Sequence, residues 1–168
     1  VESMIRETHA IPTTSLKEYE AQGKLHWVDL EQMYFDHVKK SFDLPAINNS
    51  GIKIGYDAMY GAGQRIAQRI LTNMHVLHCD DNPGFKGQAP EPIHRNLLEL
   101  SDLIKYDPSL KCGLANDGDA DRIGMYDGEG NFVDSHHIIL LLINYLHKYK
   151  GYTSKVVIAL SMSEKVKR

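Results

Sequence analysis

Three aspartates at alternate positions are the residues whose types and spacing best suit chemistry in this sequence. Asp117, Asp119 and Asp121 are separated by single small residues, and Arg122 follows the last of them. Small intervening residues let the backbone curl around one ion, and a cation compensates carboxylates that would otherwise raise one another's pKa values. Oxygen-only ligands favour Mg²⁺, Ca²⁺ or Mn²⁺ over Zn²⁺ or Cu²⁺. The spacing predicts a cation site, with a solvated acidic turn as the alternative.

The register of this loop argues against an EF-hand calcium loop. Counted from Asp117, an EF-hand needs glycine at its sixth position and glutamate at its twelfth. The sequence has Arg122 and Gly128 at those positions. A guanidinium beside the ion instead suits a phosphate that contacts the metal and the arginine together.

The segments around the loop alternate between strand and helix patterns, which favours an α/β fold. We predict a mixed, largely parallel sheet with helices on both faces, and the acidic loop directly after one of its strands. A parallel sheet presents its ligand-binding loops at that edge. Turn chemistry over 127–131 predicts a hairpin that leads to Phe132 and Val133. The expected strands cover residues 52–56, 75–79, 111–115 and 123–126, and the expected helices cover 29–42, 62–74 and 93–106.

The last third of the chain predicts one more helix and one more strand. Ser135 can cap a helix that ends near Lys150 and Gly151 and buries one apolar face. Residues 155–160 then form a strand pattern with little chain after it. We therefore expect a lead-in with a linking helix over 1–50, an α/β domain over 51–151, and the first strand of a truncated following domain over 152–168. The predicted buried face consists of Ile138, Ile139, Leu142, Ile143 and Leu146.

The composition and charge of the chain exclude some classes of function. The 168 residues are 42% hydrophobic and 24% charged, with a formal net charge of -3 and a pI near 6.3. No basic field is available to hold a polyanion, so we expect no nucleic-acid partner. The longest apolar run, 138–143, is much shorter than a membrane span, and the first residues lack a signal-peptide pattern. We expect a cytoplasmic protein with no membrane partner.

Other residues that could do chemistry are interpreted as structural. The pairs His136–His137 and His75–His78 lack further ligands at metal spacing, and Cys79 and Cys112 sit in separate apolar stretches that are typical of reduced, buried thiols. Gly61 to Gly63 indicates a tight, closely packed turn rather than a dinucleotide site. Ser161 and Ser163 follow the last predicted strand, with no general base identifiable near them.

The segment from Gly113 to Arg122, which reads GLANDGDADR, resembles the metal-loop signature of the α-D-phosphohexomutases, the phosphoglucomutase and phosphomannomutase family. The segments 61–63, 83–85, 90–92 and 127–130 reinforce the resemblance in the same order as in the family. Together they cover about 51–160 and are similar to the second domain of this four-domain family, with the entry to the third.

The resemblance implies a reversible transfer of phosphate between the 1 and 6 positions of a hexose phosphate. In such enzymes the transfer passes through an active-site phosphoserine and a hexose bisphosphate. By this resemblance, Asp117, Asp119 and Asp121 would be the ligands of Mg²⁺, and Asp121 and Arg122 would border the phosphate. The metal would neutralise charge on the transferring phosphoryl group.

The chain also departs from the family pattern. The family's serine loop is found nowhere in the 168 residues, and Tyr60 stands where the family more often has asparagine. We therefore expect a fragment with no catalytic residue of its own, inactive alone. Two alternatives remain: a module that binds a divalent cation or phosphosugar without turnover, and a different metal-dependent phosphotransferase or glycosyl transferase.

Overall fold

Residues 14–159 are described by a computed structural model, in which the chain divides into two units, Val1–Tyr34 and Phe35–Arg168. Each unit is described by itself. Within the described residues, no helix is both long and apolar enough to cross a membrane.

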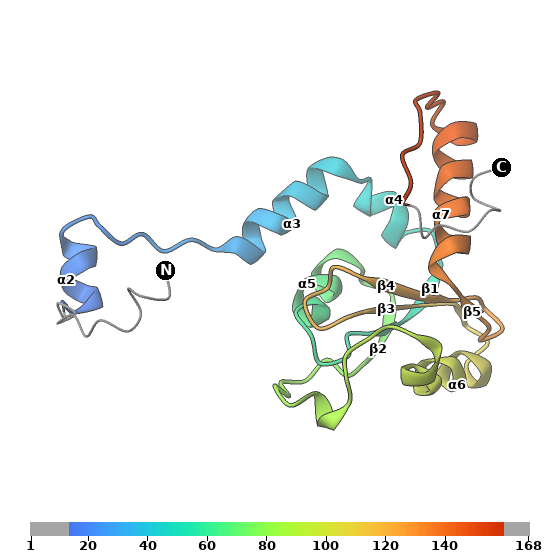
Figure 1. The fold of residues 1–168 in the computed structure, drawn as a ribbon, viewed down its shortest axis with the longest axis horizontal. Coiled ribbons are helices and arrows are strands. Elements are labelled where there is room, and N and C mark those ends of the chain that lie inside the picture. The colour runs from blue at the N-terminus through green and yellow to red at the C-terminus, as the bar shows by residue number, and fades with distance from the viewer. Residues whose placement is uncertain (1–13, 160–168) are drawn as a thin grey trace. The chain divides into compact units, whose positions relative to one another are not determined.

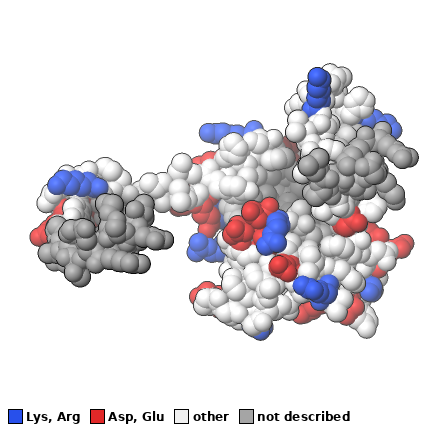
Figure 2. Space-filling view, viewed as in Figure 1, with Lys and Arg blue, Asp and Glu red and all other residues white. Residues whose placement is uncertain are grey.

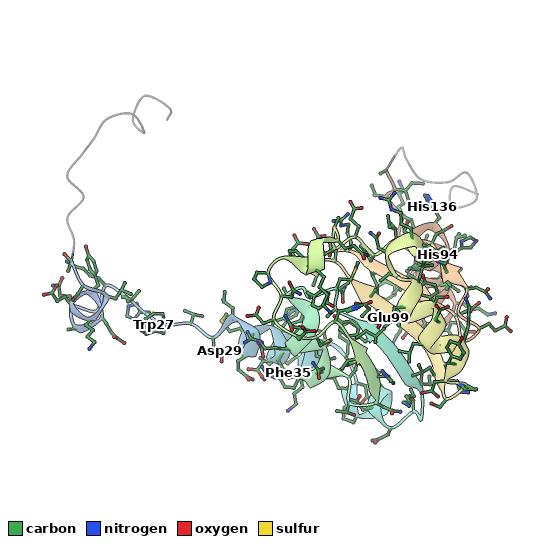
Figure 3. All side chains as sticks on the ribbon, turned by 90° about the horizontal axis from the view of Figure 1, so that it is seen from below. Trp27, Asp29, Phe35, His94, Glu99 and His136 are labelled. Carbon is green, nitrogen blue, oxygen red and sulfur yellow. The ribbon has the colours of Figure 1, made fainter. Side chains whose placement is uncertain are left out.

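The first unit contains a short helix, α2 (Leu16–Ala21), and the start of α3 (Leu30–Ser41). A capping box begins α2, because Ser15 and Glu18 each bond the other's backbone N–H. Asp29 begins α3 by accepting a 2.9 Å hydrogen bond from the Gln32 backbone. Figure 3 labels Trp27 and Asp29 on the segment that leads into this helix.

In the second unit, the end of α3 and a short helix, α4 (Leu44–Asn48), lie against α5 (Gly63–Ile70). The Arg69 guanidinium lies 4.6 Å from the centre of the Phe35 ring. The Asn48 side chain donates to the Ile70 carbonyl at 3.0 Å and accepts from the Thr72 backbone at 2.9 Å. These contacts connect α3 and α4, which precede residue 50, with α5 and the residues after it. The predicted boundary between residues 50 and 51 stays a prediction.

A five-stranded mixed sheet forms the centre of this unit (Figure 1). Its spatial order is β2-β1-β3-β4-β5. The first three of these strands are parallel, β4 pairs antiparallel with β3, and β5 pairs antiparallel with β4. The hairpin between β4 and β5 is confirmed. The strands are β1 (Lys53–Asp57), β2 (Met74–Leu77), β3 (Leu110–Asn116), β4 (Ile123–Tyr126) and β5 (Phe132–Val133).

Helices cover both faces of the sheet, which confirms the predicted fold class. α6 (Leu98–Tyr106) packs directly on β1 and β3, where Gly55 and Gly113 leave room. A Cβ at Gly113 would lie 2.5 Å from the Ile104 side chain. Neighbouring residues of a strand point to opposite faces, so Tyr56 points away from α6 and meets α5 at Gly63.

The main core lies on the α6 side of the sheet. Its buried side chains come from α6 and the residue before it, from β3 and β4, and from the turn after β1. They are Met59, Leu97, Leu100, Ile104, Leu110, Ala115 and Tyr126, each at most 5% exposed. The large aliphatic members supply most of the apolar burial that stabilises the unit.

Several predicted boundaries differ from the structure. α5 ends at Ile70, because Met74 pairs with Ile54 and belongs to β2 rather than to the helix. The helix predicted over 93–106 divides into a 3₁₀ turn, His94–Asn96, and α6, because Leu97 between them has non-helical backbone angles. A second 3₁₀ turn, Phe85–Gly87, lies in the predicted loop.

The last helix, α7 (Ser135–Asn144), continues into one π-helical turn, η3 (Tyr145–Tyr149). Its cap is Asp134, which accepts a 3.0 Å bond from the His137 backbone, so the predicted cap at Ser135 is wrong by one residue. The predicted burial of its apolar face is also wrong for the described residues: Leu142 is 53% exposed and Leu146 43%. Residues 155–159 are not in a strand, and Leu160 lies outside the described residues.

We predict that Leu100→Ala lowers the free energy of unfolding by about 2–5 kcal/mol, because it leaves a cavity between α6 and the strand glycines. Urea denaturation followed by circular dichroism measures this. Leu98→Ala is the matched control on the same helix, since Leu98 is 52% exposed, and it should cost less than about 1 kcal/mol. Equal losses in the two variants would contradict the assignment of the core to this helix face.

Candidate metal centre

The three aspartates lie in the loop that joins β3 to β4, directly after the end of β3. One carboxylate oxygen from each of Asp117, Asp119 and Asp121 lies within 4.8 Å of the others. Asp117 is buried, whereas the other two are exposed. The Ala120 backbone N–H donates to the Asp117 carbonyl at 3.1 Å, and Ala120 itself has a left-handed φ of 62°. This turn brings three residues of alternate sequence position to one side of the loop.

Asp117 is held by Arg122 at the other end of the loop. One Asp117 oxygen accepts the Arg122 backbone N–H at 2.9 Å, and the other accepts the Arg122 Nε at 2.6 Å. Burial alone would favour the neutral carboxyl, but these hydrogen bonds and the guanidinium charge outweigh it and hold the pKa of Asp117 below its ordinary value. The buried member of the trio is therefore charged.

The two exposed aspartates repel each other and Asp117. The negative charges of Asp119 and Asp117 raise the pKa of Asp121 above its ordinary value. Arg122 offsets this only in part, with its Nε 3.7 Å from an Asp121 oxygen. Figure 2 shows acidic and basic side chains in small mixed groups over the visible face, without a broad basic area.

The donor set fits a hard divalent cation. All three side chains offer oxygen, and two oxygens on opposite sides of one Mg²⁺ are about 4.2 Å apart, twice the usual bond length. The three observed oxygens lie within 4.8 Å of one another, so these side chains could hold one ion. Within residues 14–159, no other set of three histidine, cysteine or acidic side chains converges in this way.

Two residues outside the predicted site anchor the end of the loop. The Asn116 side chain donates to the Arg122 carbonyl at 2.9 Å and accepts from the Tyr56 hydroxyl at 3.1 Å. Gly63 makes room for that hydroxyl, because a Cβ there would overlap it. A strand residue 60 positions earlier thus supports the loop. The sequence offered no signal for this, since periodicity does not report which side chains meet across strands.

The glycine turn after β1 packs against the backbone of the acidic loop. A Cβ at Gly61 would lie 2.7 Å from the carbonyl oxygens of both Asp117 and Gly118, and the Ala62 N–H donates to the Gly118 carbonyl at 2.9 Å. The interpretation of this turn as a close-packing element is confirmed. Gly118 in turn has no room for a Cβ, which would lie 2.9 Å from Pro90.

The other candidates have structural surroundings. His78 is hydrogen-bonded to buried Asp57 at 2.9 Å, and His137 pairs with the α7 cap Asp134 at 3.0 Å. Cys79 and Cys112 are free thiols, and burial raises the pKa of each. Ser161 and Ser163 lie outside the described residues.

Comparisons with known proteins identify the family of this chain. The family model described as phosphoglucomutase/phosphomannomutase, alpha/beta/alpha domain II, matches residues 32–130. A phosphopentomutase of Thermococcus kodakarensis is 31% identical over 126 residues, which are 71% of this chain and 27% of that protein. A phosphoglucosamine mutase of Desulforamulus reducens is 32% identical over 139 residues, 79% of this chain and 30% of that protein.

Solved structures match as well. A phosphoglucomutase/phosphomannomutase family protein of Burkholderia thailandensis has a TM-score of 0.65 at 19% identity, a likeness in fold, over 80% of this chain and 31% of that one. The chain spans less than a third of each of these relatives. The matched model covers β1 to β4, the glycine turn and the acidic loop together, and the chain therefore belongs to the phosphoglucomutase/phosphomannomutase family, as its domain II.

Proposed function

We propose that this chain supplies the magnesium loop of a phosphosugar mutase. The observation that carries the proposal is the convergence of Asp117, Asp119 and Asp121 at the sheet edge, with Arg122 bound to the buried member. An ordinary solvated turn has no need to bury one charged carboxylate and hold it with two hydrogen bonds. The activity belongs to a longer protein, since the relatives are more than three times the length that this chain spans.

In this proposal the three aspartates hold Mg²⁺, which supplies charge neutralisation to the transferring phosphoryl group. Asp117 is the rigid ligand, because both of its oxygens are already positioned by Arg122. Asp119 and Asp121 are exposed and approach from the solvent side. Their mutual repulsion without an ion favours capture of a cation.

Arg122 has two tasks in the proposed site. Its Nε holds Asp117, which fixes the direction of the guanidinium plane. Its side chain is 59% exposed, so the outer edge of the guanidinium can contact a phosphate that also touches the metal. A lysine could not do both, because it lacks a planar fork.

The reaction is transfer of a phosphoryl group between two hydroxyls of one sugar phosphate. A phosphoserine on another part of the full-length protein gives its phosphoryl group to the sugar, and the resulting bisphosphate returns the other one to the serine. This chain positions the metal and the phosphate rather than the nucleophile. The relatives are named for a pentose and for glucosamine, so the proposed substrate class is a sugar monophosphate, with the hexose 1- and 6-phosphates as the first choice.

We predict that the 168-residue chain binds Mg²⁺ and that Asp119→Asn weakens this binding at least about tenfold, because one charged ligand is lost. Calorimetric titration measures the affinity. Asp102→Asn on α6 removes the same charge from an exposed site outside the loop and should bind as the parent does. Without metal, Asp119→Asn should leave the urea midpoint unchanged or raise it, because it relieves the repulsion on Asp121. Equal Mg²⁺ binding in both variants would remove the ligand assignment.

In the full-length protein, Asp119→Asn should lower the turnover of glucose 1-phosphate to glucose 6-phosphate by at least about 100-fold, as loss of electrostatic stabilisation does. A coupled dehydrogenase assay follows the product. The 168-residue chain alone should give no product, since the proposed nucleophile lies elsewhere. Turnover by the pure chain, or unchanged turnover in the full-length variant, would count against the proposal.

A further inference from the structure

A separate cavity of about 410 Å³ lies beside the ends of β1 and β2. Its walls come from the turn after β1, from the end of β2, and from the segment between the first 3₁₀ turn and the start of α6, where Figure 3 labels Glu99. The volume falls in the range of small-molecule sites. Neither the acidic loop nor Arg122 contributes to its lining.

Left-handed backbone conformations concentrate around this cavity. Six non-glycine residues among those described have a positive φ, and five of them line it. The sixth is Ala120 of the acidic loop. Such conformations cost free energy and cluster where a structure holds a ligand. The five are Met59 (47°), Tyr60 (60°), His78 (50°), Phe85 (50°) and Lys86 (50°).

A buried carboxylate joins the two strained turns that follow β1 and β2. Asp57, 1% exposed, accepts the Met59 backbone N–H at 2.8 Å and bonds His78 Nδ1 with both oxygens at 2.9 Å. The other ring nitrogen of His78 lies 3.3 Å from a Glu99 oxygen. The Tyr60 ring packs on the His78 ring, with centroids 4.7 Å apart. The turns after β1 and β2 are therefore fixed relative to each other without a ligand.

The cavity keeps one buried hydrogen-bonding group unused. The Tyr60 hydroxyl is buried, and no group is placed in hydrogen-bond geometry with it. A buried, unpartnered hydroxyl costs free energy, and an acceptor oxygen in the cavity would remove that cost. Phe85 adds an apolar wall.

The charges that line the cavity favour an anion. Lys86 and Arg95 contribute two cations, and Glu99 contributes the one carboxylate. The Lys86 ammonium lies 5.0 Å from the centre of the Tyr60 ring, and its interaction with the Tyr60 side chain raises the pKa of Lys86. Arg95 is 77% exposed, and its nearest acid, Glu91, is 3.7 Å away, a weak surface pair. Glu99 already faces His78.

We propose that this cavity binds a phosphorylated small molecule, with its phosphate on Lys86 and Arg95 and an oxygen accepting from the Tyr60 hydroxyl. The site is distinct from the metal centre and needs no metal. The two share one wall, because Phe85 and Pro90 line the cavity and also pack against Gly118 of the acidic loop. The inference does not depend on the proposed mutase activity.

The test is NMR titration of the 168-residue chain in a chelator, with inorganic phosphate, glucose 6-phosphate and glucose as probes. Both phosphate probes should shift the backbone amides of 59–60, 78 and 85–88, whereas glucose should not. Tighter binding of glucose 6-phosphate than of phosphate would assign the cavity to a whole sugar phosphate, and equal binding would assign it to the phosphate group. Shifts centred on 117–122 instead would overturn the proposal.

Two variants test the assigned contacts. Lys86→Gln with Arg95→Gln should weaken phosphate binding at least about fivefold, whereas Lys105→Gln with Lys111→Gln, which removes the same charge from exposed sites outside the cavity, should not. Tyr60→Phe should weaken glucose 6-phosphate binding without lowering the urea midpoint, because no group is in hydrogen-bond geometry with its hydroxyl in the free protein. Equal losses in the two double variants would overturn the site.

Asp119→Asn separates this proposal from the metal centre. The variant should lose Mg²⁺ affinity while keeping phosphate binding at the cavity in chelator. Loss of both would show that the phosphate site depends on the acidic loop and would overturn the claim of a distinct site. Unchanged Mg²⁺ affinity with retained phosphate binding would contradict the mutase proposal alone.

Discussion

A carboxylate that is 1% exposed can stay charged only where the protein replaces the water it has lost. Arg122 does this for Asp117 with its backbone N–H and its Nε, one on each carboxylate oxygen. Because the two residues are five positions apart, the same pair of bonds also closes the loop between them. The surface positions of Asp119 and Asp121 follow from that closure, as does the outward edge of the guanidinium. Asn116 and Tyr56 then tie the closed loop to the sheet.

From β1 to α7 the order of strands and helices was predictable, because each of these elements has its own periodic pattern and the turns between them are marked. β4 was predicted to the residue, since the acidic loop ends on one side of it and a strong turn begins on the other. The predicted ends of helices and strands were wrong where the hydrophobic pattern of one element continued into the next. Met74 is apolar and extends the helical pattern, yet it pairs with Ile54 in the sheet. Asp134 and Ser135 are both good caps, and only the observed bond to His137 separates them.

The candidate site was predictable to the extent that it is local. Alternate aspartates within five residues are visible in any reading of the chain. The supports are not local, because Tyr56 lies 60 residues from Asn116 and Gly61 lies far from the carbonyls it touches. The prediction that the apolar face of α7 is buried was wrong for a related reason. The periodicity of a helix indicates which of its faces is apolar, whereas burial depends on whether another surface covers that face.

Gly61 lies so close to the backbone of Asp117 and Gly118 that no side chain fits between the two loops. Gly118 also packs against Pro90, so the acidic loop contacts two segments that precede it in the chain. The DGDADR sequence is consequently not a portable element. In another α/β protein that lacks a glycine turn packed against this loop, the same six residues would lose the contacts that shape their backbone. Transplanting the site means transplanting three segments and the strand order that brings them together.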